Sequence, residues 1–275
     1  MLQFSIRHAA PVVAAMVVSA GAAQAQGLFG YAGGDNDLYS VNASGPTATF
    51  IGNDSNSGIL AEIEWGGGFI WGADTGVNTN LHKIDPATGQ VVGTLTLTFP
   101  TQGDVLTALE FVGSTLYAGL TTEGGGETYL ATVDTVGGTV TSIGATGAGS
   151  PFGGLAFDGT TMYGITSGGS AATLYTIHLG TGAGTSVGQV TLNGTTIGAT
   201  ALEFGTDGVL YALPNPASGN AGSLLTIDPG TAVATNLGDL GVPGMNALTA
   251  VPEPATLTVL GVASLLGFAR RRRRG

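Results

Sequence analysis

The sequence contains no cysteine, and only seven of its 275 residues are Lys or Arg. A chain without cysteine forms no disulfides and no thiolate metal sites. This chain is nevertheless long enough to bury a sizeable hydrophobic core. Its stability must therefore come from packing rather than from covalent or thiolate–metal cross-links.

Basic residues are missing from most of the chain. Between Arg7 and Arg270 the only one is Lys83, against all 18 carboxylates, which gives this stretch a net charge of −17. A surface of that sign repels phosphate backbones. The charge pattern therefore excludes nucleic acid as a partner and leaves an acidic body suited to solubility or to divalent cations.

Residues for nucleophilic catalysis are scarce. Beyond the N-terminal segment the chain has two histidines, His82 and His178, and both fall on or near predicted strands as ordinary strand residues. No Gly-x-x-x-x-Gly-Lys loop for phosphate binding occurs. We therefore expect no catalytic residues and no organic cofactor.

Glycine, by contrast, is abundant. The chain has 49 glycines, and only 9% of its residues are charged. Average glycine usage is about 7%, and glycine permits the positive φ angles of tight hairpins at low steric cost. This composition favours an all-β fold with many short connections.

The N-terminus has the three parts of a secretory signal peptide. Arg7 supplies a positive region, residues 9–20 form an apolar stretch, and Ala23 and Ala25 are the small residues of a cleavage site. We expect residues 1–25 to direct export through the Sec machinery and to be removed after Ala25. The alternative is an uncleaved anchor.

The C-terminus combines a short apolar segment with a basic cluster. Residues 255–269 carry no charge. A helix of this length extends about 22 Å, against about 30 Å for a hydrocarbon core, so it spans only if the bilayer thins locally or the flanking side chains snorkel. The positive-inside rule keeps the following arginines in the cytoplasm; they are Arg270, Arg271, Arg272, Arg273 and Arg274.

Pro252, Glu253 and Pro254 precede the apolar segment. The order of Pro-Glu-Pro, apolar helix and Arg cluster resembles the PEP-CTERM sorting signal of Gram-negative bacteria. The resemblance implies transient anchoring in the inner membrane, cleavage by an exosortase, and passage to the cell surface or the medium, often with extracellular polysaccharide. The alternative is a plain C-terminal anchor. The resemblance covers residues 251–275 and says nothing of the body.

The body between these signals, residues 26–250, is a repeat. One segment recurs with its central aliphatic residue at spacings of 46, 46, 47 and 46; these residues are Ile63, Leu109, Leu155, Leu202 and Leu248. A second segment carries an aromatic residue, and a third ends in a polar turn residue. The third segments are residues 38–42, 81–85, 130–134, 174–178 and 224–228. A fourth segment, rich in Thr and Val, follows.

Four short strands in about 45 residues make one β-propeller blade. The N-terminal copy lacks its first segment, while the last first segment, residues 246–250, has no followers. Together they complete one blade, so we predict a five-bladed β-propeller closed by its two ends. The alternatives are a six- or seven-bladed ring, a β-solenoid or a sandwich. The body also resembles secreted bacterial propeller repeats, in which strand three runs into an Asp-containing turn, as in residues 81–89.

Glu64, Glu110 and Glu203 occupy the same repeat position, directly after the central aliphatic residue. Side chains alternate along a strand, and first strands line a propeller channel, so these glutamates are expected near the axis. Carboxylate oxygens suit a hard cation such as calcium. The alternative is that they pair with backbone N–H groups at blade seams and bind nothing.

The sequence predicts an exported binding or structural protein of the cell surface or matrix, with exopolysaccharide or a surface protein as its partner. The alternative is an exported lyase or hydrolase acting on extracellular glycan. An enzyme should gather acid, base or His residues on one propeller face, and only the glutamate trio meets that description.

Overall fold

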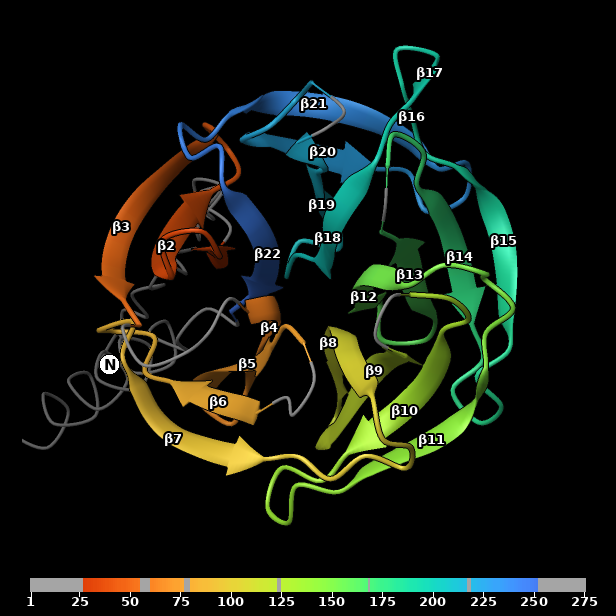
Figure 1. Ribbon diagram of the computed structural model, residues 1–275. Coiled ribbons are helices and arrows are strands. Elements are labelled where there is room, and N and C mark those ends of the chain that lie inside the picture. Colours follow the sequence, from red (N-terminus) through yellow and green to blue (C-terminus); the bar gives the residue numbers. More distant parts are fainter. Residues whose placement is uncertain are drawn as a thin grey trace, which may run out of the picture.

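Five sheets stand around a common axis in the computed structural model (Figure 1). The structure describes residues 27–54, 60–76, 80–122, 125–167, 169–216 and 219–251. In four of the sheets the strands follow the chain from the axis to the rim, and in the fifth the last strand of the chain lies innermost, before the first three strands. The predicted five-bladed β-propeller is therefore confirmed.

The four predicted segments of each repeat are the four strands of each blade. The inner strands are β4 (Leu60–Gly66), β8 (Asp104–Val112), β12 (Phe152–Phe157), β18 (Ala199–Phe204) and β22 (Met245–Ala250). The second strands are β5 (Phe69–Asp74), β9 (Thr115–Thr122), β13 (Met162–Thr166), β19 (Leu210–Pro214) and β1 (Gly27–Ala32).

The outer half of each blade consists of two further strands. The third strands are β6 (Asn80–Ile84), β10 (Tyr129–Val133), β14 (Thr173–Ile177), β20 (Ser223–Ile227) and β2 (Asp37–Asn42). The rim strands are β7 (Val91–Thr96), β11 (Val140–Ala145), β15 (Gly184–Gln189), β21 (Val233–Asp239) and β3 (Thr47–Asn53).

The ring closes where the last strand joins the first. β22 pairs antiparallel with β1, from Leu28 opposite Ala250 to Ala32 opposite Met245. One more backbone bond, from the N–H of Val251 to the carbonyl of Gly27 at 2.8 Å, extends the ladder. The predicted closure by the two ends of the body is thus correct, and both chain-terminal sheet edges are hidden.

The hydrophobic core lies in the seams between blades. The central aliphatic residues of the inner strands, exemplified by Ile63 and Leu109, are at most 1% exposed. The buried residues form five clusters, and each cluster combines side chains of two adjacent sheets. A blade therefore cannot bury its apolar faces alone, because each face is covered by its neighbour.

One blade departs from the predicted four strands. A small hairpin of β16 (Thr191–Leu192) and β17 (Thr195–Thr196) precedes β18, and β16 pairs in parallel with the rim strand β21, which makes a six-stranded sheet. The hairpin projects from the rim (Figure 1). Asn193 and Gly194 turn it with φ angles of 51° and 78°, as a two-residue type I′ turn requires. The prediction of five four-stranded blades was wrong here. The repeat spacing of 46–47 residues does not reveal that the segment between two blades forms strands of its own.

Every inner strand contains a β-bulge at the same repeat position. The pairing register shifts by one residue near the start of each inner strand. The extra residues are Ala61, Thr107, Gly153, Thr200 and Asn246. A bulge bends the strand and re-aims the side chains that follow it, so all five strands approach the axis in the same way.

The predicted signal peptide, residues 1–25, and the predicted sorting helix within residues 251–275 lie outside the described residues, apart from Val251. The parts of the chain that the structure describes include no helix long and apolar enough to cross a membrane.

Gly154→Ala should destabilise the ring, because β12 lies close against the neighbouring inner strand β18 at this residue. A Cβ built at Gly154 lies 2.4 Å from the backbone nitrogen of Leu202 on β18, so one strand must move. We expect a loss of about 1–3 kcal/mol in the free energy of unfolding, measured by urea titration. Gly34→Ala is the matched control: its Cβ meets nothing within 4 Å, and its effect should stay within about 0.5 kcal/mol. Equal stabilities of the two variants would contradict this packing.

Candidate functional site

The inner strands present one row of side chains to the seam cores and another to the axis. Ile63 packs in a seam cluster, so its neighbours Glu62 and Glu64, which share the opposite strand face, point the other way. The residues equivalent to Glu64 in the other blades are Glu110, Ala156, Glu203 and Thr249. The axis is therefore lined by three carboxylates, one methyl group and one hydroxyl at this level.

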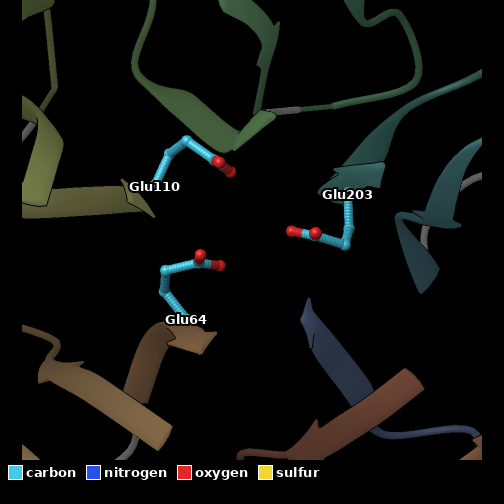
Figure 2. Close-up of side chains that lie close together, drawn as sticks. All are labelled: Glu64, Glu110 and Glu203. Atoms are coloured by element: carbon cyan, nitrogen blue, oxygen red, sulfur yellow. The ribbon is translucent and has the colours of Figure 1, made fainter. Parts of the chain in front are cut away.

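Three predicted site residues meet at the axis. Glu64 on β4, Glu110 on β8 and Glu203 on β18 point toward one another (Figure 2). Each offers a carboxylate oxygen that lies within 4.8 Å of the other two. The three side chains are only 5–7% exposed. We call Glu62, Glu64, Glu110 and Glu203 the channel glutamates.

Backbone and hydroxyl donors from neighbouring blades hold these carboxylates. The N–H of Phe111 donates to Glu64 Oε1 at 3.3 Å, and the hydroxyl of Thr249 donates to Glu64 Oε2 at 3.1 Å. The N–H groups of Phe157 and Ala250 hydrogen-bond Glu110 and Glu203 in the same way. The two interpretations of the trio are thus compatible. Glu64, for example, accepts hydrogen bonds at a blade seam and also faces the other two carboxylates at the axis.

Glu62 is a fourth buried carboxylate that repeat comparison missed. It is 1% exposed and precedes Glu64 by two residues on β4. Its Oε1 accepts from the N–H of Leu248 across the closing seam at 3.3 Å. Its equivalents in the other blades are Ala108, Gly154, Ala201 and Ala247. The only sequence signal was the Glu-x-Glu spacing, which puts both side chains on one strand face.

Burial raises the pKa of all four channel glutamates. It raises the pKa of Glu64 to about 8, against the opposing effect of the donors from Phe111, Thr249 and Trp65. The pKa values of Glu62, Glu110 and Glu203 are also raised well above the usual range, by burial first and then by the negative charge of neighbouring channel glutamates. Both effects disfavour the ionised form.

No basic side chain of the described residues balances this cluster. Lys83 is the only Lys or Arg among them, and its ammonium lies over the rings of Phe69 and Trp71, at 3.8 and 5.4 Å from their centroids. His82 Nε2 bonds Asp74 Oδ1 at 2.7 Å. The negative charge at the axis must therefore be neutralised by protons or by a cation from solution.

The two histidines of the described residues and a serine in a nucleophile-like sequence lie on the outer strands or in a turn, away from the axis. His82 is on β6, whereas His178 follows β14 and lies in a turn beside Thr181. Residues 184–188 have the Gly-x-Ser-x-Gly spacing of a nucleophile elbow, but they form the rim strand β15, while an elbow is a strand-to-helix turn. Ser186 therefore lacks the geometry of an activated serine.

A recess of about 290 Å³ opens at the bulged ends of the inner strands. Its lining includes the bulge residues of all five blades, together with Thr75, Ser167 and apolar residues such as Phe152. No Asp, Glu, His, Lys or Tyr is among the described residues that line it. The buried hydroxyl oxygen of Thr200 has no hydrogen-bond partner within the described parts of the chain. We call this recess the channel mouth.

In a buffer free of divalent cations, the free energy of unfolding should fall as pH rises from about 4.5 to about 8. Over this range Glu64 keeps its proton in the folded chain but loses it in the unfolded chain, so rising pH favours unfolding. Glu64→Gln removes this titration and should make the fall shallower. Urea unfolding between about pH 5 and about pH 8 measures the slope. A stability that stays level or rises across this range contradicts the buried, protonated site.

The other predicted site residues lie outside the described part of the chain: Ala23 and Ala25 of the cleavage site, Pro252, Glu253 and Pro254, and the arginine cluster 270–274. At the level of sequence, residues 250–274 match the family model of the PEP-CTERM protein-sorting motif. This motif implies processing by an exosortase and export to the cell envelope or surface. No curated protein matches the chain.

Solved structures resemble the body in fold. The structure of a nidogen/laminin complex aligns with a TM-score of 0.51 and 13% identity, over 81% of this chain and 84% of that one. Glutaminyl cyclase from Myxococcus xanthus aligns with a TM-score of 0.45 and 19% identity, over 70% of each chain. Such identities bear on the fold alone, and only the first alignment supports it. The chain is thus a five-bladed β-propeller body followed by a PEP-CTERM protein-sorting motif.

Proposed function

We propose that this exported protein is a binding or structural module of the cell surface or extracellular matrix, which holds exopolysaccharide or a surface protein at the channel mouth. In this proposal the Sec machinery exports the chain, its C-terminal segment anchors it in the inner membrane, and exosortase cleavage near Pro252, Glu253 and Pro254 lets the propeller pass to the surface. The observation that carries the binding role is the chemistry of the channel mouth.

The channel mouth suits a neutral ligand that has an apolar face and a few polar groups. Hydroxyl groups of Thr107, Ser167 and Thr200 and the amide of Asn246 line it, and such groups exchange hydrogen bonds with sugar hydroxyls or peptide groups. Thr200 Oγ1 has no partner among the described residues. A buried polar atom without a partner is costly, and rotation of this side chain toward the recess would let a bound ligand supply one.

The size of the channel mouth limits the ligand. Its volume of about 290 Å³ is at the lower end of the range of about 300–1,000 Å³ for small-molecule sites. We therefore expect it to take one sugar unit or one side chain of a larger partner, with the surrounding loops contacting the rest.

The geometry favours binding over glycan hydrolysis. The paired carboxyl groups of glycosidases are about 5–5.5 Å or about 6.5–9.5 Å apart, so that a sugar or a sugar and water fit between them. Oxygens of Glu64, Glu110 and Glu203 lie within 4.8 Å of one another, and none of the three lines the channel mouth. The trio thus lies apart from the recess, and the mouth itself offers no general acid or base among its described residues.

Thr200→Val tests the binding role, because it removes the unpartnered hydroxyl and keeps the shape of the side chain. We expect the affinity of the full chain for exopolysaccharide of its own bacterium to fall about 3- to 10-fold, the effect of one hydrogen bond. The free energy of unfolding should be unchanged or higher, because no partner within the fold is lost. Isothermal titration calorimetry and urea unfolding measure the two quantities.

Thr141→Val is the matched control, since Thr141 is exposed on the rim strand β11. This variant should bind like the wild type. Equal binding by all three proteins, or no binding by the wild type, overturns the channel mouth as the site. Release of shortened glycan during the titration decides for the exported lyase or hydrolase.

A further inference from the structure

We propose that Glu64, Glu110 and Glu203 bind one calcium ion on the propeller axis, with Glu62 supplying further negative charge beside it. This site is separate from the channel mouth and does not depend on the proposed function. Its role is to tie together three blades through their inner strands β4, β8 and β18.

The oxygen spacing fits calcium. Calcium–oxygen distances are about 2.3–2.6 Å, so three oxygens spaced evenly around one ion are about 4.0–4.5 Å apart. One carboxylate oxygen from each of Glu64, Glu110 and Glu203 lies within 4.8 Å of the other two. Small rotations of the three side chains therefore bring all three oxygens to one ion.

An unpartnered oxygen points to a missing ligand. Glu110 is 5% exposed, and its Oε2 has no hydrogen-bond partner among the described residues. Its carboxylate faces those of Glu64 and Glu203 (Figure 2). Oε2 of Glu62, which is 1% exposed, likewise has no partner within the described ranges. Native folds rarely leave such buried oxygens without a hydrogen bond or an ion, and the two orphans belong to one cluster.

The described part of the chain supplies too little positive charge for the cluster. Lys83, the only Lys or Arg of the described residues, lies against Phe69 and Trp71. Buried charges are normally paired or bound to metal. Ala156 and Thr249 occupy the other two positions of the ring, and they add neither a charge nor a bulky side chain. Water molecules can supply the rest of the six to eight oxygens that calcium takes.

The donor set selects calcium over other metals. All ligands are carboxylate oxygens, while zinc and copper prefer His or Cys. Magnesium requires near-octahedral geometry at about 2.0–2.1 Å, and three oxygens spaced evenly around it would be about 3.5–3.6 Å apart. Backbone donors of Phe111, Phe157 and Ala250 fix the three carboxylates from the adjacent blades, so the cluster cannot contract easily. Calcium tolerates irregular geometry and a wider spacing.

The test uses the full chain after treatment with a chelator, at moderate ionic strength to screen its acidic surface. Calcium chloride alone should bind with a stoichiometry of one per chain in isothermal titration calorimetry. At about 100-fold excess over Kd it should raise Tm by roughly 5–10 °C, and magnesium at the same concentration should raise Tm far less.

Glu110→Gln removes one ligand charge and keeps the side-chain shape, so it should abolish the calcium-dependent rise in Tm. Without calcium this variant should melt at the same temperature as the wild type or higher, because one buried acid is gone. Glu203→Gln should behave alike and replaces Glu110→Gln if that variant does not fold. Glu127→Gln is the matched control: Glu127 bonds the N–H of Gly147 in a loop outside the trio, and its variant should keep the full response.

Three results overturn the site. The first is a wild-type chain whose Tm does not change with calcium. The second is a calcium response that survives in both Glu110→Gln and Glu203→Gln. The third is an equal response to magnesium, which indicates general screening of the acidic surface. None of these results bears on glycan binding at the channel mouth, so the two proposals fail independently.

Discussion

The pairing of β22 with β1 is the interaction on which the rest of the structure depends. The chain has no cysteine, so no disulfide closes the ring. Five residue pairs between the two ends of the propeller sequence do so instead. The same pairing sets Thr249 beside Glu64 and brings the N–H of Leu248 to Glu62. The arrangement at the axis therefore exists only while the ring is closed.

A second constraint explains why all five inner strands approach the axis in the same way. Each inner strand must pack aliphatic residues into a seam and also approach four other strands around a narrow channel. The bulge at Ala61 and its four equivalents meets both demands, because it bends the strand and re-aims the side chains after it. The bulge residues line the channel mouth, and the residues beyond them form the glutamate level. One local irregularity, repeated five times, thus produces both candidate sites.

Much of this could be predicted from the repeat itself. A residue such as Leu109 recurs because every blade must bury an inner strand, and strand alternation placed Glu64, Glu110 and Glu203 on the axis. Glu62 was not predicted, because small residues such as Ala108 occupy its position in the other blades. Comparison of the repeats therefore could not single it out. The bulges and the β16–β17 hairpin could not be predicted from the repeat. Both depend on how strands pair in space, through the pairing register and the parallel contact with β21. The channel mouth is assembled from residues far apart in sequence that carry no motif.

The most direct test of this account is amide hydrogen exchange of the folded chain, resolved to single strands. If β22 closes the ring, its backbone N–H groups exchange as slowly as those of β8, an inner strand far from the closure in sequence. Both then open only on global unfolding. Exchange of β22 at the rate of an exposed loop, with β8 still protected, would contradict the closed propeller and with it the arrangement of the channel glutamates.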